Sequence, residues 1–119
     1  MEKNFENLKV VSREFTRERD WDKFHSPKNL IMAMFKEIGE LSEIFQWKDE
    51  KLSFKDNLDS DEIENIKDEL SDILIYLIRI SDVLDIDLIS SSFNKIEKNN
   101  IKYPIEKSKG SSVKYNKLK

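Results

Sequence analysis

The sequence is poor in the residues that form tight turns, covalent cross-links and soft metal sites. It has no cysteine, one histidine, two glycines and two prolines among 119 residues. The lack of cysteine excludes disulfides and thiolate metal sites. A single histidine argues against a ferritin-like di-iron centre, which needs a Glu-x-x-His pair on each of two helices. The scarcity of glycine and proline favours long helices with few tight turns.

Two further features are missing, and each excludes a class of partner. No stretch approaches the roughly 18 consecutive apolar residues of a membrane span, and the first residues lack the apolar run of a signal peptide. The net charge is -3, so there is no overall basic surplus for nucleic acid. We therefore expect a cytoplasmic protein without membrane or nucleic-acid partners.

Apolar residues recur with helical spacing over most of the chain, which predicts an all-α fold. The expected helices cover residues 3–19, 29–47, 61–84 and 87–101, as a four-helix bundle in a single domain, 1–119, with a basic tail over 103–119. The length fits one domain. A small bundle has a thin core, so we expect a dimer or tetramer that buries more surface.

The helix over 29–47 carries acidic residues beside a broad apolar stripe. Glu37 lies at the edge of the stripe, Glu40 lies one step further round, and Glu43 points away. Glu37 and Glu40 are three residues apart, so they are neighbours on one face. The stripe consists of Leu30, Ile31, Met34, Phe35, Ile38, Leu41 and Phe45.

The helix over 61–84 repeats this arrangement. Glu69 lies at the edge of its stripe, Asp72 follows three residues later on the same flank, and Tyr76 continues that flank one turn on. The stripe consists of Ile63, Ile66, Leu70, Ile73, Leu74, Leu77, Ile78 and Ile80. If the two helices face each other, four carboxylates come together.

Four carboxylates at close range raise one another's pKa unless a cation compensates them. Oxygen ligands suit Mg²⁺, with Mn²⁺ as a second choice. The alternative is a solvated acidic face, because a chain with 24 Asp and Glu produces such spacings by chance.

A loop rich in rings separates the first two helices. Trp21 and Phe24 can plug the end of the bundle, or Trp21 and His25 can form one wall of a pocket for a planar ligand. Ser26 can cap the next helix, with Pro27 at its first position.

Polar signals mark the later boundaries. Residues 48–60 read as a linker, Asp59 and Glu62 form a capping box for the third helix, and Asp85 or Asp87 can cap the fourth. Basic and amide side chains gather at the end of the fourth helix, at Lys95, Lys98, Asn99, Asn100 and Lys102. They either match the helix dipole or bind phosphates.

These residues together resemble the MazG-like, all-α nucleoside triphosphate pyrophosphohydrolases, and within that family the dCTP-hydrolysing subgroup. The family mark is E-x-x-E followed by E-x-x-D on the next long helix, here Glu37-Ile-Gly-Glu40 and Glu69-Leu-Ser-Asp72. The other matching segments are Arg19-Asp20-Trp21, Phe24-His25-x-Pro27-x-Asn29-Leu30, Gly39-Glu40-Leu41-x-Glu43-x-Phe45-Gln46-Trp47, Ile73-Leu74-Ile75-Tyr76-Leu77, Lys95-x-x-x-Asn99-x-x-Lys102-Tyr103-Pro104 and Lys114-Tyr115.

The resemblance implies a Mg²⁺-dependent enzyme that cuts a nucleoside triphosphate, such as dCTP or a modified dCTP, between the α- and β-phosphates. The implied metal ligands and catalytic residues are Glu37, Glu40, Glu69 and Asp72. Trp21, His25 and Trp47 match positions around the base, and Tyr76 lies near the sugar or the metal. Lys95, Asn99, Lys102 and Tyr103 match positions near the phosphates, with a neighbouring subunit as one source of them.

Two departures from the family pattern bear on the site. Many members have a second glutamate just before the first motif acid, where this chain has Lys36, a residue that cannot be a ligand. The position near Ser12 is histidine in some relatives, which leaves the preferred base open. Hydrolysis of dUTP or of many nucleotides is one alternative, and a non-enzymatic helical interaction module is another.

Overall fold

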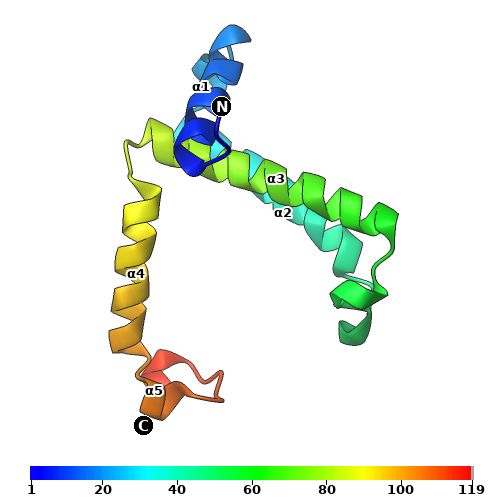
Figure 1. Ribbon diagram of the computed structural model, residues 1–119, viewed down its shortest axis with the longest axis vertical. Coiled ribbons are helices and arrows are strands. Elements are labelled where there is room, and N and C mark those ends of the chain that lie inside the picture. Colours follow the sequence, from blue (N-terminus) through cyan, green and yellow to red (C-terminus); the bar gives the residue numbers. More distant parts are fainter. Residues whose placement is uncertain (119) are drawn as a thin grey trace. The chain divides into compact units, whose positions relative to one another are not determined.

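The computed structural model describes residues 1–118, which contain helices and no strand (Figure 1). The α-helices are α1 (Phe5–Glu18), α2 (Pro27–Phe45), α3 (Ser60–Val83), α4 (Leu88–Lys102) and α5 (Ile105–Ser108). Short 3-10 helices lie at η1 (Asp22–Phe24), η2 (Glu50–Ser53), η3 (Lys55–Asn57) and η4 (Tyr115–Lys117). The all-α prediction is confirmed, and α1 to α4 lie within two residues of the expected bounds. The short helix α5 was not expected in the basic tail.

The chain forms two compact units, Met1–Asp85 and Ile86–Lys119. The first unit contains α1, α2 and α3, and the second contains α4 and α5. The single-domain organisation and the packing of α4 into a four-helix bundle therefore stay predictions. None of the helices in the described part of the chain is both long and apolar enough to cross a membrane.

Side-chain caps fix the starts of the long helices at the expected residues. Ser26 accepts a hydrogen bond from the backbone N–H of Asn29 at the start of α2, with Pro27 in the first turn. Asp59 and Glu62 form the predicted capping box of α3. Asp87, rather than Asp85, caps α4. These local signals set where each helix begins, and so which side chains share a face.

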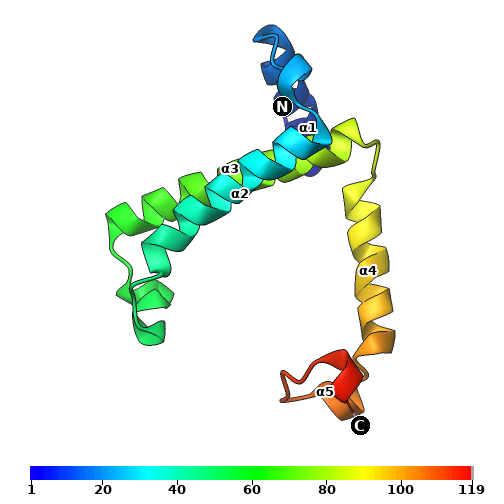
Figure 2. The same cartoon turned by 180° about the vertical axis from the view of Figure 1, so that it is seen from behind.

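Helices α2 and α3 lie side by side and run in opposite directions, as both views show (Figures 1 and 2). The segment between the two helices contains η2 and η3 and reverses the direction of the chain, so α3 packs antiparallel to α2. The centre of the pair is small, because Leu30 and Ile78 are the buried apolar residues of the described chain. Phe35 and Leu70, which the apolar stripes placed in the core, are 62% and 51% exposed. That expectation is wrong for a single chain.

Helix α1 packs on α3 and is joined to it by a charged network. The Arg13 guanidinium donates to both oxygens of Asp82, with Nε 3.0 Å and Nη2 2.6 Å from them. Arg79 donates from Nη1 to Asp82 at 3.1 Å and from Nη2 to Asp22 at 3.3 Å. Thr16 also donates to Asp22, at 2.8 Å. We call these five side chains the arginine–aspartate network; it joins α1, α3 and the turn η1.

Candidate functional site

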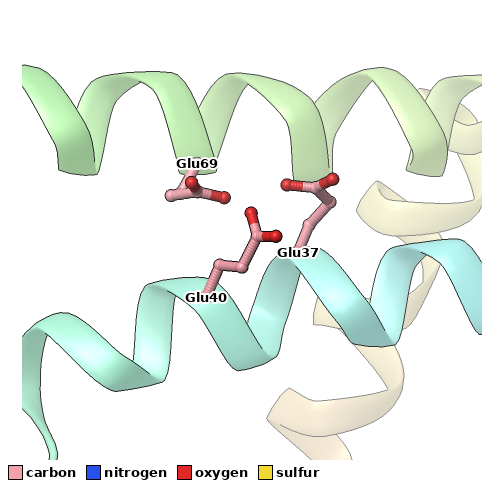
Figure 3. Close-up of side chains that lie close together, drawn as sticks. All are labelled: Glu37, Glu40 and Glu69. Carbon is pink, nitrogen blue, oxygen red and sulfur yellow. The ribbon is translucent and has the colours of Figure 1, made fainter.

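Three of the predicted carboxylates converge between α2 and α3. Glu37 and Glu40 come from α2 and Glu69 comes from α3, and the three side chains point toward one another (Figure 3). One oxygen from each lies within 4.8 Å of the others, and all three residues are half-buried. The spacing of three residues on α2 places its two acids on one face, and the antiparallel partner helix brings the third opposite them. We call Glu37, Glu40 and Glu69 the carboxylate group.

The charges of the carboxylate group are poorly compensated by the protein itself. Lys36 Nζ lies 3.9 Å from Glu40 Oε1, but the ammonium is exposed. Glu69 Oε2 is buried and has no hydrogen-bond partner in residues 1–118. A hydrogen bond with Glu37, burial, and the negative charge of Glu40 raise the pKa of Glu69 to about 7. The group therefore either holds a proton or needs a cation, and its hard oxygen ligands fit Mg²⁺ or Mn²⁺.

Proton binding at Glu69 predicts a pH dependence that a divalent cation should reverse. Because the pKa of Glu69 in the folded chain is above its ordinary 4.5, its contribution to stability is full below pH 4.5 and is lost as the pH rises through about 7. We expect the melting temperature in EDTA to fall across this window, and the stabilisation by Mg²⁺ to grow across it, because the metal displaces the proton. Thermal shifts of the wild type and of Glu69→Gln between pH 5 and 8 measure this. Identical pH profiles of the two proteins would contradict it.

Asp72, the fourth predicted ligand, is placed differently. Its oxygens are outside the carboxylate group, and the residue is exposed. It lines a cavity of about 470 Å³ next to the group, and Glu37 belongs to both. The structure thus brings three of the four predicted acids together and puts the fourth on the wall of the adjoining cavity.

The same cavity contains two of the three residues expected around the base, Trp21 and His25, and also Tyr76, which was expected near the sugar or the metal. Trp21, His25 and Tyr76 line it together with Glu37 and Asp72. Phe15 stacks edge-on against Trp21, with ring centroids 5.7 Å apart, which holds the indole at the wall. Of the two interpretations of this loop, the structure favours the pocket wall for Trp21. Phe24 is 57% exposed and is not part of the wall.

His25 is a neutral polar group in this wall. Burial and the positive charge of Arg79 lower its pKa, and Asp22 opposes this only in part. Its Nδ1 is buried without a hydrogen-bond partner among the described residues. An imidazole with a free ring nitrogen beside an indole can hydrogen-bond and stack on a planar ligand.

Trp47 does not reach this cavity. It is 88% exposed and lies two residues beyond the end of α2, whereas Trp21 precedes the start of that helix. The 19 residues of α2 span about 28 Å at 1.5 Å per residue. Trp21 and Trp47 of one chain therefore cannot enclose the same base.

The residues expected near the phosphates lie in the second unit. Lys95 and Lys102 are exposed, Asn99 is half-buried, and Tyr103 is 39% exposed. Lys102 Nζ lies 5.7 Å from the centroid of the Tyr103 ring. Their approach to the carboxylate group stays a prediction.

Arg79, which lines the cavity and is 4% exposed, was not among the predicted site residues. The signal was present, because Arg79 interrupts an apolar run between Ile78 and Ile80. An arginine within the buried stripe of a helix needs acceptors nearby, and Asp82 stands three residues on.

Comparisons with known proteins agree on one family. The model of the MazG-like family matches residues 32–118. dCTP pyrophosphatase 1 of Rattus norvegicus is 38% identical over 117 residues, or 98% of this chain and 69% of that protein. The Homo sapiens protein of the same name is 37% identical over the same shares. The crystal structure of a pyrophosphatase from Archaeoglobus fulgidus superposes with a TM-score of 0.72 and 37% identity, covering 87% of this chain and 95% of that one.

Proposed function

This chain belongs to the MazG-like family, and we propose that it is a divalent-metal-dependent nucleoside triphosphate pyrophosphohydrolase acting on dCTP or a modified dCTP. The carboxylate group is the observation that supports this proposal most directly, since its three oxygens converge beside a cavity lined by an indole and an imidazole, side chains on which a nucleobase can stack. The relatives named dCTP pyrophosphatase 1 support the choice of substrate. A non-enzymatic helical module would not require a buried, unpaired carboxylate oxygen at Glu69.

The proposed reaction is an in-line displacement at the α-phosphorus. Glu37, Glu40 and Glu69 would hold Mg²⁺, with Asp72 as a further ligand, and the ion would supply positive charge to offset that of the triphosphate. Glu37 or Glu40 accepts a proton from a water molecule, whose oxygen bonds to the α-phosphorus. The bond from that phosphorus to the bridging oxygen breaks, and pyrophosphate leaves with both electrons. The products are the nucleoside monophosphate and pyrophosphate.

The cavity wall positions the nucleoside end of the substrate. Trp21 offers a ring face for stacking, and His25 a hydrogen-bonding edge. Tyr76 lies one turn beyond Asp72 on α3 and lines the same cavity, where it would contact the sugar. Lys95, Asn99, Lys102 and Tyr103 are the proposed phosphate contacts.

A panel of nucleotides with Mg²⁺ tests the reaction and the substrate together, with products separated by chromatography. We expect dCMP and pyrophosphate from dCTP at a higher kcat/KM than the corresponding products from other nucleotides. Pyrophosphate from dUTP or from many nucleotides would retain the chemistry and reject the narrow substrate. Release of inorganic phosphate, or no product with Mg²⁺ or Mn²⁺, would reject the proposal.

The thin core supports a homodimer or homotetramer as the working form. Large apolar side chains of the first unit stay exposed, and apolar side chains line a second cavity of about 660 Å³, which is bounded by the start of α1 and by Leu74. Surfaces of this kind mark contacts with another chain. A second copy is then the proposed source of a Trp47 side chain for the base, since a chain's own Trp47 does not reach the cavity lined by Trp21 and His25, which we call the base pocket.

Mixing two inactive variants tests this shared site. Glu40→Gln and Trp47→Ala chains, each inactive or weak alone, should recover activity after co-refolding if a site takes its acids from one chain and its tryptophan from another. About a quarter of the wild-type rate is expected for random pairing into dimers, in which half of the molecules are mixed and each mixed molecule has one intact site. Sedimentation gives the assembly size in parallel. A monomer, or mixtures no more active than their components, would contradict the shared site.

A further inference from the structure

Arg79 lines the base pocket but has no part in the chemistry proposed above. It belongs to α3 one turn beyond Tyr76, and its side chain is 5% exposed. A guanidinium has five N–H donors and cannot lose its charge in a protein. A charged group this deep in a small helical unit must be held by acceptors and also affects any ligand beside it.

The arginine–aspartate network accounts for the charge of Arg79. Asp82 and Asp22 lie on either side of the guanidinium, and Arg13 shares Asp82 with it. Two carboxylates thus balance two guanidinium groups. The orientation of Arg79 is fixed, since its Nη1 and Nη2 contact carboxylates that belong to different elements.

The network leaves part of the hydrogen-bonding capacity of Arg79 unused. Its Nε is buried and has no hydrogen-bond partner in the described part of the chain. His25 Nδ1, on the same cavity wall, is likewise buried and unpaired. Unpaired buried polar atoms are costly, and two on one wall of a ligand cavity suggest that the ligand supplies the missing partners.

We propose that Arg79 is a specificity-determining residue whose guanidinium donates a hydrogen bond to the O2 carbonyl oxygen of a pyrimidine base. This rests on the proposed function. Arginine donors require an acceptor, and every pyrimidine base carries O2 whereas adenine has no carbonyl. Both unpaired atoms are shielded from water in the structure, so the proposal requires the cavity wall to open slightly for the base to reach them.

Cytosine and adenine provide a clean comparison. Both present an amino group next to a ring nitrogen acceptor, but only cytosine has a carbonyl beyond that nitrogen. The ratio of kcat/KM for dCTP to that for dATP therefore reports on the carbonyl as well as on ring size. Replacing O2 by sulfur in 2-thio-dCTP isolates the carbonyl, because sulfur is a weak acceptor.

The experiment measures kcat and KM for dCTP, 2-thio-dCTP and dATP in the wild type, Arg79→Lys, Arg79→Gln and the control Arg13→Lys. Arg13 bonds the same Asp82 but does not line the cavity. We expect wild-type KM to rise about tenfold from dCTP to 2-thio-dCTP, the loss of one buried hydrogen bond. That difference should disappear in both Arg79 variants, with the dCTP to dATP ratio about tenfold lower, and should persist in Arg13→Lys.

The outcomes separate this inference from the proposed function. A wild type that hydrolyses dCTP and 2-thio-dCTP equally well would overturn the role of Arg79 while leaving the enzyme activity intact. If Arg79→Lys and Arg13→Lys have the same ratio of kcat/KM for dCTP to kcat/KM for dATP, and their melting temperatures fall equally, Arg79 has only a structural role. A wild type that releases pyrophosphate from no nucleotide would overturn both. The comparison of dCTP with 2-thio-dCTP needs no variant, so a variant that fails to fold does not remove the test.

Discussion

Replacing Glu40 by Gln is expected to lower kcat by more than about 10²-fold while the protein stays folded. Changing a residue that only supports a metal ligand typically costs 10- to 100-fold in affinity or activity, so losing a ligand should cost at least as much. The substitution preserves the size of the side chain but removes one negative charge from the carboxylate group. The variant should also hold Mg²⁺ less tightly, because the carboxylate group loses one anionic oxygen ligand.

Glu43→Gln is the matched control for this prediction. Glu43 lies on the same helix, is exposed, and is outside the carboxylate group. The substitution at Glu43 removes the same charge from a position three residues after Glu40, so a general electrostatic effect would appear in both variants. Steady-state rates with saturating dCTP, together with a Mg²⁺ titration followed by thermal shift, give the comparison. Near-normal turnover in Glu40→Gln would remove Glu40 from the site.

Asp82→Asn should destabilise the fold by about 3 kcal/mol, because it leaves the buried Arg79 without one of its two carboxylates. For a chain of this size, that loss lowers the melting temperature by about 10 °C. The amide keeps the shape of the carboxylate but brings an N–H₂ group against two guanidinium groups. The contact between α1 and α3 weakens with it, since Arg13 reaches α3 through Asp82.

The pH profile of this variant follows from the charge. The hydrogen bond from Arg13 lowers the pKa of Asp82 below its ordinary 3.8. The stabilisation is therefore full above pH 3.8 and is lost only as the pH falls through the lower value of the folded chain. The free energy of unfolding, measured with denaturant at pH 7 and at pH 3, should differ less between the wild type and the variant at pH 3 than at pH 7. Asp85→Asn is the control, because Asp85 is exposed with a φ of 56°, a conformation that asparagine tolerates. Equal destabilisation by both substitutions would exclude the network as the cause.

Local signals in the sequence predicted the helices well. The caps at Ser26, Asp59 and Asp87 depend on side chains and backbone groups three residues apart, so neighbouring residues determine them. The facing of Glu37 and Glu69 also followed from periodicity, because two amphipathic helices that pack must align their stripes. Their roles as metal ligands stay a prediction.

Features that depend on distant residues were harder to predict. Periodicity placed Phe35 and Leu70 in a core that the chain alone does not complete, because an apolar stripe looks the same whether it meets its own chain or another. The arginine–aspartate network joins Asp22 to Arg79, which are 57 positions apart, and Arg13 to Asp82, which are 69 positions apart. No local spacing reveals contacts of this kind. Likewise, Trp21 and Trp47 were both expected around one base, but the 19 residues of α2 lie between them and keep them apart in a single chain.

The small centre formed by Leu30 and Ile78 has a consequence for how this protein behaves at different concentrations. A chain with so little buried apolar surface draws much of its folding free energy from association, under the proposed assembly. Folding then follows mass action, and dilution shifts the population toward unfolded chains. Activity would then rise more steeply than the first power of the subunit concentration, so that a modest increase in synthesis would raise the activity per chain as well as the number of chains.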